Sequence, residues 1–395
     1  MSENEAQAES PTSQRKDDHI RLALAQHAPE RPRDYDHVRF VHHALAGGSS
    51  AAVSLASPAF SWSAPLYVTG MTGGTARAHE INRGIGILGR ETGIAVACGS
   101  MGIVLREPET AASFTVLREE NPDGFVMANT NANVTGAQAA RIVGIMGADA
   151  LQVHINAPQE IAMPEGDRDF TAWRDNIAEI VDAVEVPVIV KEVGAGLSRG
   201  SIAVLRDLGV GGVDVAGRGG TDFGAIESAR RAGGARSYLA SWGQSAVSAL
   251  VDAAGLEGVG PWGRDAAGIG TRGAGAAGVL GSSAPAPVDE RVALLASGGV
   301  RHPLDVVRAL ALGADAVGVA GQFLQVLVTE GPSALVDTVQ EWLEEIRDLM
   351  ALLGAPDIRA LRRTDVLLSG PVREFAELRG IDAAAYARRS AWSQV

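Results

Sequence analysis

Cysteine is almost absent from this sequence of 395 residues, in which Cys98 is the single example. A lone cysteine excludes an internal disulfide framework and a cysteine-rich zinc site. Such low cysteine usage is typical of reducing compartments, so we expect a cytoplasmic protein.

Positive charge and long apolar runs are also scarce. The 34 lysines and arginines face 47 acidic residues, which gives a formal net charge of −13. Without a basic tract, neither a nucleic acid nor an anionic membrane surface is an expected partner. Residues 44–76 carry no charge, but six serines, Pro58 and Pro65 interrupt them. They therefore do not form a bilayer-spanning helix, and the N-terminus shows no secretory signal pattern.

Glycine is the residue in excess, with 48 of 395 positions, or about 12% against a usual 7%. Hydrophobic residues (46%) and charged residues (21%) are close to the globular norm, which excludes a wholly disordered chain. The glycine excess indicates many tight loops and close approaches of the backbone to a ligand.

Short apolar runs alternate with amphipathic stretches from residue 65 onward. Continuous apolar character without alternation is typical of strands that are buried on both faces. The sequence predicts eight strands, at 66–72, 95–100, 124–129, 150–156, 187–193, 211–217, 292–298 and 315–321. Eight strand–helix units favour a (β/α)₈ barrel, an α/β fold, with a doubly wound open sheet as the second choice.

The remaining segments complete the expected organisation. Helices are predicted at 171–184, 201–208 and 303–312, the last opening on Pro303 and stopping at Gly313. We expect a disordered leader (1–14), a single domain (15–382) with a Gly/Ala-rich insertion (255–287), and a tail (383–395). The stretches 335–353 and 357–395 read as helices that cap the barrel or serve subunit contacts.

Barrel active sites form at the C-terminal ends of the strands, so the residues there carry the functional prediction. Ser297-Gly298-Gly299-Val300-Arg301 follows the seventh strand and Val319-Ala320-Gly321 ends the eighth. Small residues let backbone N–H groups approach a phosphate, and a helix N-terminus adds positive potential. Two glycine sites at these two strands favour phosphate binding over ordinary turns.

Two further strand ends offer polar groups. Lys191 ends the fifth strand, where it could meet a phosphate or an anionic ring; pairing with Glu192 or solvation at the rim is an equal alternative. Thr221, in the glycine-rich rim after the sixth strand, offers a hydroxyl and a backbone N–H.

The end of the fourth strand gathers His154, Asn156, Gln159 and Glu160 within seven residues. A Mg²⁺ ion takes one or two carboxylates and leaves its other positions to water and substrate phosphate, a role that suits Glu160. A turn whose polar groups satisfy one another explains the same residues equally well.

Arg15 and Lys16 are adjacent cations that could clamp a diphosphate, although a solvated basic pair is the common explanation. Met71-Thr72-Gly73-Gly74, Gly99-Ser100 and Asn129 follow the first three strands. All eight rim positions thus carry small or polar groups, which suits a large planar cofactor touched mainly by backbone.

Together, these motifs resemble one family, the type 2, flavin-dependent isopentenyl-diphosphate isomerases. The ordered set is specific, whereas each member alone is weak. The resembling stretches are RKDDHI (15–20), FVHHAL (40–45), MTGG (71–74), HINAPQE (154–160), PEGDRDF (164–170), VKEVG (190–194), GRGGTDF (217–223), ASGGVRHPLDVVRALALGA (296–314) and SGPVREFAELRGID (369–382).

The resemblance implies a role for each matching position. Gln159 is the catalytic residue beside the allylic carbons of the substrate, and Glu160 is the Mg²⁺ ligand. Substrate contacts fall on Arg15, Lys16, Ser100, Met101, Gly102, His154, Asn156 and Gln159. FMN contacts fall on Gly70, Met71, Thr72, Ser100, Asn129, Lys191, Thr221, Gly299, Val300, Arg301, Ala320 and Gly321.

Two positions depart from the family. Gly102 stands where many members have an arginine that contacts substrate, and Gly70 replaces the usual alanine. The resemblance further implies conversion of isopentenyl diphosphate to dimethylallyl diphosphate by reduced FMN, with NADPH as reductant, in a homo-oligomer (tetramer or octamer).

Three rival functions remain. An FMN-dependent 2-hydroxyacid oxidase would need a His/Arg pair at late strand ends; Arg218 and Arg301 are present there, but the one histidine, His302, resembles the start of a helix. A dehydrogenase of the inosinate type would need a loop cysteine, whereas Cys98 lies inside the second predicted strand. A non-catalytic barrel is disfavoured because every rim position keeps a small or polar group.

Overall fold

The computed structural model describes residues 11–26, 33–230, 236–261 and 291–394. Eight parallel strands close into a barrel in which the first strand pairs with the last. The strands are β2 (Leu66–Val68), β3 (Ala95–Ala97), β4 (Val126–Asn131), β5 (Ala150–Ile155), β6 (Val188–Glu192), β7 (Gly212–Asp214), β8 (Ala293–Ser297) and β9 (Ala316–Val319). Each overlaps one predicted run, which confirms the (β/α)₈ barrel.

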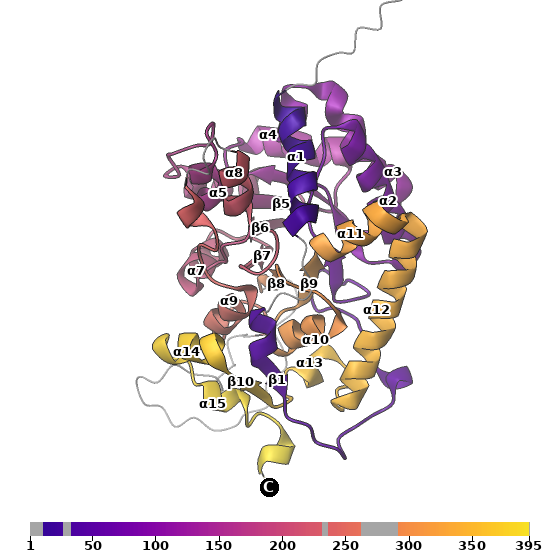
Figure 1. The fold of residues 1–395 in the computed structure, drawn as a ribbon, viewed down its shortest axis with the longest axis vertical. Helices are drawn as coiled ribbons and strands as arrows, with labels where there is room; N and C mark the ends of the chain where they lie inside the picture. The colour runs from indigo at the N-terminus through magenta and orange to yellow at the C-terminus, as the bar shows by residue number, and fades with distance from the viewer. Residues whose placement is uncertain (1–10, 27–32, 231–235, 262–290, 395) are drawn as a thin grey trace, which may run out of the picture.

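Helices follow the strands and surround the barrel (Figure 1). They are α2 (Ala76–Thr92), α3 (Ala112–Glu120), α4 (Gly136–Met146), α5 (Ala157–Ala162), α6 (Trp173–Ala183), α7 (Arg199–Asp207), α8 (Phe223–Arg230), α9 (Ala246–Ala253), α10 (Pro303–Ala311), α11 (Gly321–Glu330) and α12 (Pro332–Leu352). The three predicted helices correspond to α6, α7 and α10. Pro303 occupies the first turn of α10, where its missing N–H costs nothing.

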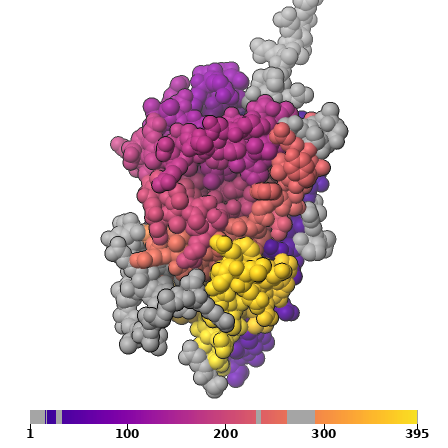
Figure 2. Space-filling view, turned by 90° about the vertical axis from the view of Figure 1, so that its left-hand side faces the viewer, coloured from indigo at the N-terminus to yellow at the C-terminus, as the bar shows by residue number. Residues whose placement is uncertain are grey.

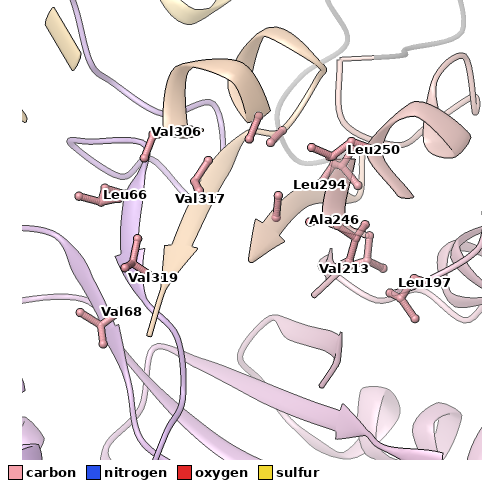
Figure 3. Close-up of a cluster of buried hydrophobic side chains, with 14 of the residues drawn as sticks. Leu66, Val68, Leu197, Val213, Ala246, Leu250, Leu294, Val306, Val317 and Val319 are labelled. Carbon is pink, nitrogen blue, oxygen red and sulfur yellow. The ribbon is translucent and has the colours of Figure 1, made fainter. Parts of the chain in front are cut away.

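Two apolar layers stabilise the barrel, because successive side chains of a strand point to opposite faces. Leu66, Val68 and Val317 belong to the outer cluster, in which Leu66 and Val317 lie near Val306 of α10 and Leu294 lies beside Leu250 of α9 (Figure 3). The inward side chains form a separate cluster that includes Tyr67, Met127, Ile189 and Leu295, with Trp62 packed against Tyr67.

The C-terminal segment is not wholly helical, contrary to the prediction. It holds α13 (Ile358–Leu361), α14 (Gly370–Leu378) and α15 (Ala383–Tyr386), but also β10 (Val366–Leu368), which pairs antiparallel with β1 (Val38–Phe40). Helix α14 contacts α9 and α13 contacts α10, and the C-terminal residues form the yellow region in the lower half of Figure 2. The pairing was missed because two three-residue strands far apart in sequence carry no local signal.

Helix α1 spans Pro11–Gln26, so residues 11–14, which we expected to be disordered, are helical. Residues 1–10 lie outside the described part. Most of the expected insertion (262–287) also lies outside it. Among the described residues, no helix is both long enough and apolar enough for a bilayer crossing.

Candidate active site

A cavity opens at the C-terminal ends of the barrel strands and gathers most of the predicted flavin contacts. Ten of the twelve line it: Gly70, Met71, Thr72, Lys191, Thr221, Gly299, Val300, Arg301, Ala320 and Gly321. The other two lie nearby. Asn129 is so close that a Cβ on Gly70 would lie 2.9 Å from its Nδ2, and the carbonyl of Ser100 accepts from Lys16.

Glycines after β7 and β8 line this cavity, and their backbones pack closely. Gly298 (φ 95°) and Gly299 (φ 80°) are left-handed, which favours glycine. A Cβ on Gly298 would lie 2.2 Å from the carbonyl oxygen of Gly217, and one on Gly299 would lie 3.2 Å from Gly219. Helix α11 begins at Gly321, which lines the same cavity. The rim therefore presents backbone and a helix N-terminus, as an anion requires.

Arg301 has a different environment from that expected. Its backbone N–H donates to Asp305 (3.2 Å), and its guanidinium bonds Asp305 (2.9 Å) and Asp36 (2.6 Å). The hydrogen bond to Asp36 holds the pKa of that carboxyl near 2. In this geometry, Arg301 braces the rim loop against the segment before β1.

Three buried polar atoms in the cavity have no hydrogen-bond partner among the described residues: Thr69 Oγ1, Thr72 Oγ1 and Gln322 Oε1. Buried polar groups are nearly always paired, so these atoms indicate a polar ligand or ordered water. Together with the glycine rim they fit FMN, whose ring has several polar atoms and whose tail ends in phosphate. Thr69 and Gln322 were not predicted, although Thr69 directly follows β2 and Gln322 lies in the first turn of α11, just after β9.

Asp214 is buried below the cavity and accepts hydrogen bonds from Ala216 and Ser297, which line it. Tyr67 donates to its carboxylate (2.6 Å), as do Ser297 (2.9 Å) and the N–H of Ala216 (3.0 Å), a residue with positive φ. Burial raises the pKa of Tyr67 well above its usual value, so this phenol remains protonated and keeps donating.

Lys191 is neither solvated nor paired with the Glu192 side chain. Its buried ammonium donates to the Glu192 main-chain carbonyl (2.9 Å), whereas the Glu192 carboxylate accepts the N–H groups of Ala195 and Gly196. Burial and the nearby Lys191 charge lower the pKa of His154 to about 3. His154 is therefore neutral near pH 7, with Nδ1 2.9 Å from Asn129 Oδ1.

The polar residues after β5 are hydrogen-bonded to one another. Asn156 Nδ2 lies 3.1 Å from Gln159 Oε1 and 2.9 Å from Glu160 Oε1. The N–H of Asp167 donates to Glu160 Oε2 (2.9 Å). No group of three or more His, Cys, Asp or Glu side chains suited to a metal occurs within the described residues. The donor set thus fits only a cation that takes one carboxylate and fills its other positions from water and substrate.

Glu227 of α8 links this group to helix α1, a connection that the sequence did not reveal. Its Oε1 lies 2.7 Å from His19 Nε2 and 3.4 Å from Gln159 Nε2, and Arg230 bonds its Oε2 at 2.5 Å. Burial opposes ionisation of Glu227, but these hydrogen bonds hold its pKa below the usual value. His19 also lines the flavin cavity.

Helix α1 brings the predicted diphosphate clamp to the rim, beside α8 and α11 (Figure 1). Lys16 Nζ lies 3.4 Å from the carbonyl of Ser100 and 5.0 Å from the ring centre of Phe114. Met101 is buried, and at Gly102 a Cβ would meet nothing closer than Ser100 Oγ, at 3.8 Å. The Arg15 side chain lies outside the described part.

Known proteins resemble the chain at two levels. The FMN-dependent dehydrogenase family matches residues 274–368. Proteins named isopentenyl-diphosphate delta-isomerase are 48% identical in Nocardia farcinica (96% of this chain, 97% of the relative) and 46% in Streptomyces sp. strain CL190 (96% of each). One from Staphylococcus haemolyticus is 39% identical (93% and 97%).

Solved structures share the fold at low identity. A flavocytochrome b2 mutant with pyruvate bound has a TM-score of 0.58 at 17% identity (91% of this chain, 79% of that chain). A mandelate oxidase mutant has a TM-score of 0.56 at 17% identity (89% and 92%).

Proposed function

Because the chain belongs to the type 2, FMN-dependent isopentenyl-diphosphate delta-isomerases, we propose that it converts isopentenyl diphosphate to dimethylallyl diphosphate with reduced FMN and Mg²⁺. NADPH reduces the flavin beforehand and is not consumed in each turnover. The reaction adds one proton and removes another, so it has no net redox change.

The chemistry demands a shielded pocket. Protonation of an unactivated alkene creates a tertiary carbocation, which water would quench. When bound, reduced FMN supplies acid–base capacity and an electron-rich ring against that cation. Met71, Phe223, Val300 and Leu324 line the cavity, and their apolar side chains would help to exclude water from the reacting carbons.

We assign the FMN phosphate to the backbone of Gly299 and Val300 and to the start of α11 at Gly321. The isoalloxazine ring would contact Gly70–Thr72, Asn129, Lys191 and Thr221, with Ser100, Arg301 and Ala320 as further neighbours. Thr69 and Gln322 join this set because their orphaned oxygens lie in the same cavity.

The substrate diphosphate would bind between α1 and the rim of β3 to β5. Lys16 supplies a cation there, with Arg15, Ser100, Met101, Gly102, His154 and Asn156 around it. Glu160 would hold Mg²⁺, which would supply positive charge to offset that of the diphosphate.

Gln159 is the proposed catalytic residue, either as a weak proton acceptor beside the carbocation or by positioning a proton. The observation that carries the proposal is the position of Gln159 relative to the cavity. Glu227 joins Gln159 to His19, and His19 lines the cavity that holds the flavin contacts. These contacts support a single site that includes the polar residues after β5 and the cavity.

Among the described residues that follow β7, β8 and β9, no histidine lines the cavity to serve as the base of a 2-hydroxyacid oxidase. His302 precedes α10, its side chain is 45% exposed and faces Asp305 at 3.8 Å, and it does not line the cavity. Arg301 is held by carboxylates. Burial raises the pKa of Cys98 to about 12, which also removes a thiolate nucleophile of the inosinate type.

We also propose a cytoplasmic homo-oligomer, a tetramer or octamer, that binds neither nucleic acid nor membrane. The exposed apolar side chains of Tyr238, Trp242 and Leu378 support subunit contacts. Light scattering of the purified protein measures the assembly, and a monomer would contradict it.

Incubation with isopentenyl diphosphate, FMN, Mg²⁺ and NADPH, followed by identification of the product, tests the function. Dimethylallyl diphosphate should form, and omission of FMN or of Mg²⁺ should abolish or slow its formation. No product under the complete conditions would contradict the proposal.

A further inference from the structure

The loop after α5 carries the PEGDRDF stretch (164–170), to which the proposed reaction gives no role. Within this loop, the guanidinium of Arg168 donates hydrogen bonds to four main-chain carbonyls. The acceptors are Glu160 (2.5 Å), Met163 (2.6 Å), Gly166 (2.5 Å) and Asp167 (2.7 Å). The planar fork of arginine can satisfy several acceptors at once, and the ammonium of lysine cannot reproduce that geometry. Arg168 therefore folds the loop back onto α5.

This fold of the loop brings a backbone donor to the carboxylate of Glu160. The N–H of Asp167, directly before Arg168, donates to Glu160 Oε2 at 2.9 Å. The approach is so close that a Cβ on Gly166 would lie 2.1 Å from the Glu160 carbonyl oxygen. Since Asn156 holds the other oxygen, Oε1, at 2.9 Å, both oxygens of Glu160 have a fixed donor.

The loop is also held from the β4 side. The Asp167 carboxylate accepts from Asn133 Nδ2 at 2.5 Å, and Asn133 Oδ1 accepts from Trp173 Nε1 at 2.7 Å. Two sets of hydrogen bonds therefore hold the Asp167 N–H in position, those from Arg168 to the loop carbonyls and the one from the Asn133 side chain. A carboxylate has about four lone-pair sites, so two remain on Glu160 for a cation.

We propose that Arg168 is a positioning residue for the divalent-cation ligand Glu160, through the Asp167 N–H, and so controls how strongly Mg²⁺ promotes diphosphate binding. The inference rests on the proposed role of Glu160. Hydrogen-bond partners of metal ligands typically change metal affinity by about 10- to 100-fold when removed. The 164–170 stretch, although exposed, would thus serve to position Glu160.

Arg118 provides a control at the opposite end of the barrel, because its guanidinium also donates to several main-chain carbonyls, in addition to its ion pair with Asp149. Its guanidinium donates to the carbonyls of Asn121, Pro122 and Gly124 (3.1, 3.0 and 2.8 Å), in the turn before β4. Arg168→Lys and Arg118→Lys each keep the positive charge but replace the planar guanidinium with an ammonium, which cannot make the same set of hydrogen bonds. Any general loss of loop order should appear in both.

The experiment is calorimetric titration of isopentenyl diphosphate into the enzyme with oxidised FMN, with saturating Mg²⁺ and with none. The readout is the ratio of the two dissociation constants, which reports the Mg²⁺-linked gain and does not depend on turnover. Arg168→Lys should reduce this ratio by about 10-fold, with FMN affinity unchanged, and Arg118→Lys should leave it at the wild-type value.

Glu160→Gln separates failure of the inference from failure of the proposed function. If Glu160→Gln reduces the ratio but Arg168→Lys matches Arg118→Lys, Arg168 is only a structural clamp and the inference is wrong. If Glu160→Gln leaves the ratio unchanged, the metal site itself is wrong and the inference falls with it. Should Arg168→Lys fail to fold, Asn133→Ala removes the second support of Asp167 and should reduce the ratio in the same direction; an unchanged ratio there overturns the inference.

Discussion

The two sides of the site are built from different parts of the chain. The glycine rim, residues 298–301 and 320–322 after β8 and β9, presents backbone groups and left-handed glycines. The polar rim, residues 154–160 after β5, presents side chains that already bond one another. A backbone site is preformed and insensitive to protonation, whereas the polar rim must exchange internal hydrogen bonds for those of its ligand. The comparison predicts that the two rims fail in different ways.

Gly299→Val should have the largest effect, because it distorts the glycine rim. A valine at φ 80° pays on the order of 1–3 kcal/mol of backbone strain, and its Cβ would approach Gly219 to 3.2 Å. FMN affinity should fall at least about 10-fold, as measured by fluorescence quenching of the flavin. Gly331→Val is the control: Gly331 has φ 93° with nothing within 4 Å, so FMN affinity should hold. A yellow Gly299→Val enzyme with wild-type affinity would show that the phosphate site is misplaced.

Glu160→Gln should spare the glycine rim and weaken the polar one. The amide keeps the shape but loses the charge, so the Mg²⁺ concentration for half-maximal activity should rise at least about 10-fold, while FMN still binds. A Mg²⁺ titration of initial rates, with FMN saturating, measures this. An unchanged titration would make Glu160 a structural turn residue.

A change of pH should act on the polar rim through His154. Its pKa is about 3 in the folded protein against an ordinary 6.5, so the unfolded state binds the extra proton between those values. The stability that neutral His154 contributes is complete above pH 6.5 and is lost as the pH falls toward 3. Relative to His154→Gln, the wild-type free energy of unfolding should drop on the order of 1 kcal/mol more between pH 7 and pH 5. Urea unfolding of the flavin-free proteins tests this, and parallel pH curves would contradict it.

Gly102→Arg should give the smallest effect, and in the favourable direction. The space around Gly102 is open, and the family resemblance places an arginine there. We expect substrate affinity to improve by about 3- to 10-fold, the value of a partly solvated charge-assisted hydrogen bond. Gly102→Gln, which adds a shorter polar side chain without charge, is the control for bulk. Equal affinities for the two variants would argue against a diphosphate contact at this position.

The sequence predicted the barrel well because its strands are apolar on both faces, so each appears as one continuous run. It also indicated the glycine rim, since φ above zero at Gly298 and Gly299 leaves a local signature. The contact of Glu227 with Gln159 could not be predicted, because it depends on how α8 docks beside α5 and α1. The β1–β10 pair and the start of α1 at Pro11 likewise depend on tertiary contacts. Even Lys191, correctly placed at the rim, has a main-chain partner that no residue pattern specifies.

We propose that both rims serve an isomerisation in which the flavin is not consumed as an electron carrier. The direct measurement is to photoreduce the enzyme once without oxygen, add excess isopentenyl diphosphate and Mg²⁺, and count dimethylallyl diphosphate against flavin. The amount of dimethylallyl diphosphate should far exceed the amount of flavin, and the flavin should still be reduced at the end. Product limited to one equivalent, or formed only as the flavin is reoxidised, would contradict it.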